Sequence, residues 1–416
     1  MSTPRLLLAL SIAVSISLPA LAAEAPGGFW PQFHGPNRDN ISAETGLLKA
    51  WPEAGPPRLW TAEGIGHGFS SLSIAEGLIY TAGNIEGNTA ITALDLDGKI
   101  AWQKPIGPAW EKPVGGSRAT PTFDGGRLYH MSPHGDLVCL DAKSGEKQWG
   151  FNVLKKYGSK PNQWGQAESV LVEGDVLYCR PGGPETCVVA LKKLTGEVIW
   201  ESPSAQGDLA AYSSMVLVEH QGLRMILSMT TGGMIGVRAD GGDLLWRFPH
   251  KTPYDENIMT PVFHDGQVFF STGFGRGSVM LKVTVGGQSA SVEELWRNKD
   301  LDNHHGDVVL LDGYLYGSCW KPDSWTCLEW ATGKTMYAGD EGIGKGSVTY
   351  ADGLLYTVGE KTHEVGLVEP TPEGHRVVSR FKLPPGGSGP AWAHPVICGG
   401  RLYVRHGEFL YAYDVK

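Results

Sequence analysis

The sequence predicts an all-β fold, an eight-bladed β-propeller of four-stranded antiparallel blades built as a single domain. Two repeated motifs and one incomplete repeat support this prediction. The first motif is a glycine, two or three mostly apolar residues and an aromatic. It occurs at 77–80, 126–129, 174–178, 266–270, 313–316, 353–356 and 400–403, with a weaker copy at 222–226. Such repeats are typical of folds in which each unit buries its apolar face against its neighbours.

The second motif ends in an aromatic residue that closes most units. These aromatics recur at intervals of 41 to 51 residues, which is the length of a four-stranded propeller blade. We expect strand A before the glycine, strand B over the first motif, strand C over a segment such as "ALD" and strand D up to the aromatic. A Thr-Gly, Ser-Gly or Asp-Gly pair supplies the left-handed residue of the C–D hairpin. The closing aromatics are Trp102, Trp149, Trp200, Trp246 and Trp296, with Tyr337 and Phe381 as their substitutes in the next two units.

The last unit is incomplete, because the chain stops after three strands, at the end of "GRLYVRHGEFLYAYDVK" (400–416). The missing strand D is available near the other terminus, where "PPRLW" (56–60) ends in a tryptophan. Pairing this N-terminal strand with the C-terminal blade closes the ring and removes an exposed sheet edge. We therefore expect the propeller at 56–416, preceded by an N-terminal extension at 23–55 that packs on it.

The first 22 residues have the pattern of a signal peptide. Arg5 precedes an apolar run at 6–18, and the small-residue pattern Ala20-Leu21-Ala22 follows. The mature protein is therefore predicted to be exported, either periplasmic or extracellular. No cysteine follows the expected cleavage site, so we expect no membrane anchor.

Charge and cysteine usage narrow the possible partners. The net charge is −9, and there is no basic stripe for a phosphate backbone, so we expect no nucleic-acid partner. Two cysteine pairs, Cys179/Cys187 and Cys319/Cys327, each bracket one expected hairpin. In an exported protein these are either cross-strand disulfides or buried thiols.

The "ALD…TG…W" and "G-x-LY" units resemble the pyrroloquinoline-quinone-type (PQQ-like) propeller repeat of quinoprotein dehydrogenases and outer-membrane assembly propellers. The stretches "FWPQFHGPNRDNIS" (29–42) and "NHHGDVVLLDGYLYG" (303–317) further resemble a group of exported bacterial propellers named only for that repeat. The resemblance covers nearly the whole mature chain and implies the fold. It leaves the activity open, because one fold hosts many functions.

Aligning the units on the strand B aromatic gives two columns near the channel axis. Nine residues before the aromatic the column is mostly small and polar, as the narrow end of a wedge requires: Ser71, Thr120, Ser169, Ser214, Thr260, Asp307, Ser347 and His394. Two residues earlier, on the same side of each strand, every blade carries a different residue. This rim column is Phe69, Arg118, Ala167, Tyr212, Ile258, His305, Lys345 and Trp392. Polar groups converging among aromatics predict a ligand-binding mouth, and a merely polar channel opening is the alternative.

The predicted ligand-binding residues are Phe69, Arg118, Glu168, Tyr212, Asn257, His304, His305, Lys345, Trp392 and His394. Arg118 and Lys345 would neutralise an anion. In an enzyme, His305, Tyr212 and Glu168 would move protons, unless Glu168 simply pairs with Arg118. Neighbours on an extended strand point to opposite faces, so we interpret His305 as functional and His304 as its support. No ligand pair has a recognised spacing, and we therefore predict no metal site.

We expect the mouth to bind a small or polymeric ligand, with an acidic carbohydrate as the first candidate. A carbohydrate lyase or hydrolase using the same rim is one alternative. A PQQ-dependent dehydrogenase is another, for which the family resemblance implies adjacent cysteines and calcium ligands that this sequence lacks; no cofactor is therefore expected. A protein partner, as in outer-membrane assembly, is a further alternative, although the resemblance implies a lipid-bearing cysteine that is missing here. Whether the protein is an enzyme stays open.

Overall fold

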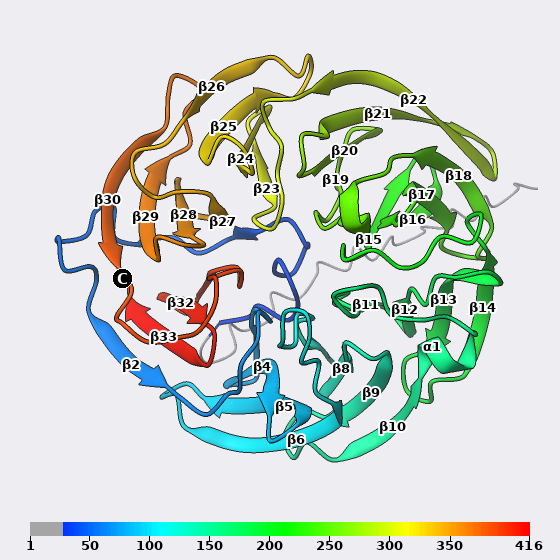
Figure 1. Ribbon diagram of the computed structural model, residues 1–416, viewed down its shortest axis with the longest axis horizontal. Helices are drawn as coiled ribbons and strands as arrows, with labels where there is room; N and C mark the ends of the chain where they lie inside the picture. The colour runs from blue at the N-terminus through cyan, green and yellow to red at the C-terminus, as the bar shows by residue number, and fades with distance from the viewer. Residues whose placement is uncertain (1–27) are drawn as a thin grey trace, which may run out of the picture.

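The computed structural model describes residues 28–416 and confirms a ring of eight antiparallel blades (Figure 1). The expected signal peptide, 1–22, lies outside the described residues. Blades are numbered here in chain order, and each has its strands in sequence from the axis outward. Blades 1 to 4 are β3 (Ser73–Ala75), β4 (Leu78–Ile85), β5 (Asn88–Asp95), β6 (Ile100–Pro108); β7 (Thr122–Asp124), β8 (Arg127–Met131), β9 (Asp136–Asp141), β10 (Lys147–Asn152); β11 (Leu171–Glu173), β12 (Val176–Cys179), β13 (Thr186–Lys192), β14 (Val198–Pro203); and β15 (Val216–His220), β16 (Leu223–Thr230), β17 (Gly233–Arg238), β18 (Leu244–Pro249).

Blades 5 to 8 complete the ring. They are β19 (Val262–His264), β20 (Gln267–Thr272), β21 (Gly277–Gly286), β22 (Ser289–Asn298); β23 (Val308–Leu311), β24 (Tyr314–Cys319), β25 (Ser324–Glu329), β26 (Thr335–Gly339); β27 (Gly346–Ala351), β28 (Leu354–Gly359), β29 (Glu364–Glu369), β30 (Arg376–Lys382); and β31 (Val396–Cys398), β32 (Arg401–His406), β33 (Phe409–Asp414) with β2 (Arg58–Ala62). Two short helical turns lie between blades, α1 (Val153–Lys156) and η1 (Pro253–Asp255). No helix among residues 28–416 is long and apolar enough to cross a membrane.

The ring closes as the sequence predicts. Strand β2 pairs antiparallel with β33, placing Trp60 opposite Ala412, so the N-terminal strand is the outermost strand of blade 8. The glycine of the first motif belongs to the A–B hairpin, where Glu76 and Gly77 both have positive φ (50° and 78°). Two-residue turns of this kind match the twist of the strands they join, which explains why the glycine recurs.

The tryptophans of the second motif join each blade to the next. Trp102 of blade 1 packs against Gly145 of blade 2, where a Cβ would lie 2.7 Å from the indole ring. Its indole N–H donates to the backbone oxygen of Ala142 (3.1 Å). The repeated glycine in the C–D turn therefore makes room for the neighbouring tryptophan. Trp60, Trp149, Trp200 and Trp296 make the same contact.

The N-terminal segment, defined here as residues 29–42, lies inside the ring (Figure 1). Trp30 bridges to Ile74 of β3, and β1 (Ile41–Ser42) pairs in parallel with β27, the innermost strand of blade 7. Between them, Arg38 donates to the backbone oxygens of Ser169 (3.1 Å) and Met215 (2.9 Å). The segment therefore crosses the central channel and divides it into two cavities.

The disulfide alternative is not found in the structure. Cys179, Cys187, Cys319 and Cys327 are buried free thiols. The hairpin register explains this, because Cys179 lies opposite Val189 and Cys319 opposite Ser324, so neither cysteine faces its sequence partner.

Candidate functional site

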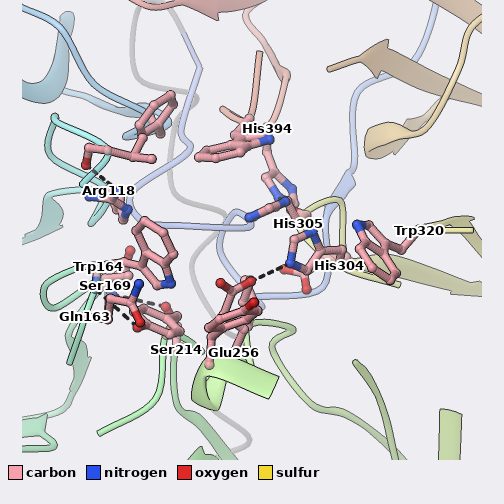
Figure 2. A pocket seen from close by; sticks show the side chains of 18 of the residues that line it. Arg118, Gln163, Trp164, Ser169, Ser214, Glu256, His304, His305, Trp320 and His394 are labelled. Atoms are coloured by element: carbon pink, nitrogen blue, oxygen red, sulfur yellow. Dashed lines mark hydrogen bonds and ion pairs between the residues drawn. The ribbon is translucent and has the colours of Figure 1, made fainter. Parts of the chain in front are cut away.

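A cavity of about 570 Å³ opens where the innermost strands begin (Figure 2). Its lining comes from the loops that precede these strands, from hairpins of blades 5 and 6, and from the N-terminal segment at its base. The lining residues are Phe33, Phe69, Val114, Arg118, Gln163, Trp164, Ala167, Ser169, Tyr212, Ser214, Tyr254, Glu256, Ile258, Phe274, His304, His305, Asp307, Trp320, Trp392 and His394. The volume suits a small molecule or the end of a chain.

The structure brings most of the sequence-predicted site residues together. Seven of the eight members of the rim column line the cavity, namely Phe69, Arg118, Ala167, Tyr212, Ile258, His305 and Trp392; His394 and His304 also line it. The eighth member, Lys345, lies outside the lining. Its ammonium pairs with Glu360 (2.9 Å), which also accepts a hydrogen bond from the indole of Trp392 (3.0 Å). Lys345 is thus bound to a carboxylate behind the wall.

Glu168 and Asn257 are not part of the cavity lining. Each is the chain neighbour of a rim residue and points the other way. Glu168 is fully buried and accepts from the backbone N–H of Arg180 (3.1 Å), so its pairing with Arg118 is not found. Burial raises the pKa of the Glu168 carboxyl to about 7, against the opposing effect of Arg180. The Asn257 amide donates to the backbone oxygen of Thr230 (2.7 Å).

Arg118 places a positive charge on an otherwise aromatic wall. Its guanidinium donates to two backbone oxygens of its own loop, Gly116 and Val114 (both 2.9 Å), and lies 5.5 Å from the ring centre of Phe69. No carboxylate among residues 28–416 lies within 4.0 Å of it. Burial lowers the pKa of Arg118 to about 10, so it stays charged at neutral pH. The charge is thus held in place by backbone dipoles and left without an ionic partner.

The two adjacent histidines both face the cavity, and this corrects the expectation that His304 points away. Their ring centres are 3.7 Å apart, and Nε2 of His304 lies 2.7 Å from Oε2 of Glu256 (Figure 2). Residues 301–304 precede β23 and are not in a strand, so the alternation of strand side chains does not apply there. His305 stacks on Trp392 (ring centres 4.1 Å apart). Burial, and next the neighbouring charge of His304, hold the pKa of His305 well below its usual value.

The opposite wall contains a hydroxyl that stays protonated. The backbone N–H of Trp164 donates to the phenolic oxygen of Tyr212 (3.3 Å). Burial raises the pKa of Tyr212 above its usual value. A neutral imidazole and a protonated phenol therefore line the same cavity as a fixed cation.

Several lining residues belong to loops that the alignment of the repeat units does not include. Glu256 follows two residues in the left-handed region, Tyr254 (φ 61°) and Asp255 (φ 57°). Phe274 (φ 66°) and Trp320 come from B–C hairpins, and their rings lie 4.6 Å apart. Such loops differ from blade to blade, so no column contains them. Backbone strain of this kind concentrates at functional sites, but it cannot be detected in a sequence.

The comparisons with known proteins agree with this architecture. A family model described as "Outer membrane protein assembly factor BamB" matches residues 45–338. The chain belongs to this family. Among solved structures, this PQQ-like propeller is similar to BamB from Moraxella catarrhalis (14% identity, TM-score 0.60, covering 87% of this chain and 98% of that one).

It is also similar to a quinohemoprotein alcohol dehydrogenase from Pseudomonas putida (12% identity, TM-score 0.61, covering 94% and 80%). A computationally designed protein matches almost as well (9% identity, TM-score 0.59, covering 86% and 100%). At these identities the likeness shows the fold alone. No curated protein sequence matches the chain.

The base of the cavity in this BamB-family propeller is a second buried cluster. Nε2 of His34 lies 3.0 Å from Oδ2 of Asp307, and Nε2 of His394 lies 3.1 Å from the backbone oxygen of His305. Burial raises the pKa of Asp307 to about 6. Beyond this layer lies the second cavity, of about 400 Å³, lined by Arg38 and the far ends of the inner strands.

Proposed function

We propose that the cavity binds a small ligand, or the end of a polymer, that carries both an anionic group and a flat apolar face. The observation that carries the proposal is Arg118, a charged guanidinium beside aromatic rings with no carboxylate partner among the described residues. A half-buried cation without a counter-ion favours an anion that arrives with the ligand. Trp164, Trp320 and Trp392 line the same cavity and supply indole surface for an apolar part of the ligand.

An acidic carbohydrate fits this combination, because its carboxylate suits Arg118 and its sugar rings suit the indoles. Export, predicted from residues 1–22, would give the protein access to cell-envelope polysaccharides, and it agrees with a family named for the outer membrane. A protein partner, which the same family name suggests, is the competing occupant.

A thermal-shift screen tests the proposal. Oligosaccharides of uronic acids should raise the melting temperature of the wild type, and neutral oligosaccharides of equal length should raise it less. Arg118→Ala should abolish the shift, and Arg118→Lys should restore part of it. Arg376→Ala is the matched control, since Arg376 is exposed and pairs with Glu369 and Glu373 on an outer strand. Equal shifts in the wild type and in Arg118→Ala would contradict the proposal.

A lyase or hydrolase acting on the same ligand is the second candidate function. It is favoured by His305, which burial keeps neutral and able to accept a proton, together with Tyr212, which stays protonated and able to donate one. Glu168 takes no part in it, because its carboxylate lies behind the wall. Incubation with an acidic polysaccharide should then produce the ultraviolet absorbance of an unsaturated sugar or new reducing ends. His305→Ala should abolish either product.

We do not extend the proposal to a quinone cofactor. None of the cysteines lines the cavity, so a vicinal pair over a cofactor ring has no counterpart here. The two carboxylates in the lining, Glu256 and Asp307, each pair with a histidine. These residues do not fit the cysteine and calcium requirements that the family resemblance implies.

A further inference from the structure

Three potential ligands for one ion meet on the wall formed by blades 5 and 6. Glu256 comes from the loop before β19, and His304 and His305 come from the loop before β23. One ligand atom from each residue lies within 4.8 Å of the other two. Nδ1 of His305 is buried and has no hydrogen-bond partner, with Oε2 of Glu360 3.9 Å away. A buried ring nitrogen without a hydrogen-bond partner calls for a group that completes it, and here it faces a carboxylate and a second imidazole.

We propose that Glu256, His304 and His305 bind a divalent transition-metal ion at the side of the cavity. Imidazole and carboxylate ligands hold such an ion at 2.0–2.2 Å, so two ligands of one ion lie at most about 4.4 Å apart. The observed spacing needs only small side-chain rotations. Nε2 of His304 already lies 2.7 Å from Oε2 of Glu256, and the ion would take the place of this contact.

The ligand set selects the kind of ion. Two imidazoles with one carboxylate suit Zn²⁺ and similar transition metals, whereas Ca²⁺ and Mg²⁺ prefer oxygen ligands alone. The site therefore differs from the calcium site that the family resemblance implies. Three protein ligands would leave a fourth position open, and the cavity that these ligands line is also lined by Tyr212 and Arg118.

The surroundings already hold the three ligands in place. His305 is stacked on Trp392, and the indole of Trp392 is fixed by its hydrogen bond to Glu360. Glu256 is directed into the cavity by the left-handed backbone of Tyr254 and Asp255. A site built from such constrained side chains loses little entropy on binding. The metal proposal goes beyond the proposed carbohydrate binding, because it requires no carbohydrate.

Calorimetric titration of the full, chelator-treated chain with Zn²⁺ tests the site, and Co²⁺ provides a coordination spectrum. The wild type should bind one ion at this site, and Ca²⁺ should not compete at equal concentration. His304→Ala should weaken binding by more than about 100-fold, since even residues that only support a ligand are worth about 10- to 100-fold. Glu256→Gln keeps the shape of the side chain and should weaken binding similarly. His264→Ala, an exposed histidine on β19, is the matched control and should leave binding unchanged.

Two further variants distinguish the outcomes. Arg118→Ala should bind Zn²⁺ at least as tightly as the wild type, so the metal proposal and the carbohydrate proposal fail independently. His34→Gln removes a residue of the base cluster, which also has ligand-like spacing to Asp307 and His394. Unchanged affinity in folded Glu256→Gln, or loss of binding in His34→Gln alone, would overturn the assignment.

Discussion

Two arginines near the central channel have different roles: Arg38 lies in the N-terminal segment, and Arg118 lies at the edge of the larger cavity. Burial lowers the pKa of both Arg38 and Arg118 to about 10. Arg38 donates to backbone oxygens of blades 3 and 4, which lie more than 130 residues away in the sequence, and to Gln32. Arg118 donates only within its own loop and faces the cavity. Arg38 is buried, whereas Arg118 is half-buried at the cavity edge, so the acceptors and the exposure of an arginine together separate a structural role from a binding role.

The largest expected effect is the loss of the Arg38 contacts. Arg38→Ala leaves the backbone oxygens of Ser169, Val170 and Met215 without their donor in a buried site. Removing one partner of a buried charged network costs about 3 to 5 kcal/mol of unfolding free energy. Chemical denaturation monitored by tryptophan fluorescence measures this loss. Arg38→Lys should recover only part of it, because one ammonium cannot reach oxygens on two blades. A loss below about 1 kcal/mol would contradict the comparison.

Glu168, which lies near Arg38, should give this region a pH-dependent stability. Burial raises its pKa from 4.5 to about 7, so the folded state holds the proton more tightly than the unfolded state. The stabilisation is complete below about pH 4.5 and is lost as the pH rises through 7. Glu168→Gln never ionises and should be more stable than the wild type at pH 8 by roughly 3 kcal/mol. The two proteins should converge below about pH 4.5 in denaturation experiments. Parallel pH profiles would show that Glu168 is ionised in the fold.

Arg118→Ala should weaken ligand binding and leave the stability of the fold nearly unchanged, which is the opposite of what we expect for Arg38→Ala. Its two acceptors lie in a short loop at the cavity edge, so the unfolding free energy should change by less than about 1 kcal/mol. Ligand affinity should fall by about 10- to 100-fold, because hydrogen bonds to charged groups contribute about 1.5 to 3 kcal/mol. Denaturation and ligand titration of the same preparation measure both quantities. Large destabilisation without loss of ligand binding would show that Arg118 has a structural role, like Arg38, and not a binding role.

The sequence predicts the parts of the molecule that repeat. The glycine and tryptophan periods predict the blades and the closure by β2, and the rim column identifies seven lining residues, including Arg118 and His305. Lys345 occupies the right column, but Glu360, four residues beyond the first motif of blade 7, binds its charge. A repeat alignment gives positions and not partners, so it cannot detect this neutralisation.

The missed residues lie where no repeat exists. Glu256 and Trp164 belong to loops between blades, and the N-terminal segment occurs once in the chain, so no comparison between blades places it in the channel. His304 is a predicted site residue that does line the cavity, but strand alternation predicts the wrong direction for its side chain, because residues 301–304 are not in a strand. The site is thus predictable as far as the strands extend toward the axis and unpredictable in the loops that complete it.

The smallest expected effect extends the comparison of acceptors to the tryptophans. Trp149 donates to the backbone oxygen of Lys193 in the next blade (2.9 Å), whereas the indole nitrogen of Trp246 has no partner among residues 28–416. In the blade after Trp246, strands β21 and β22 are longer than the C and D strands of the other blades. The turn between them therefore lies farther along the hairpin and is not the C–D turn that the other tryptophans contact.

Trp149→Phe should therefore cost about 1 kcal/mol more than Trp246→Phe, which is the net contribution of one buried hydrogen bond. Both changes remove the same ring atoms, although Trp246 is the more buried of the two, so packing alone would make its loss the larger one, and matched denaturation curves measure the difference. Equal losses would mean that packing against the next blade, rather than the carbonyl acceptor, determines what each tryptophan contributes.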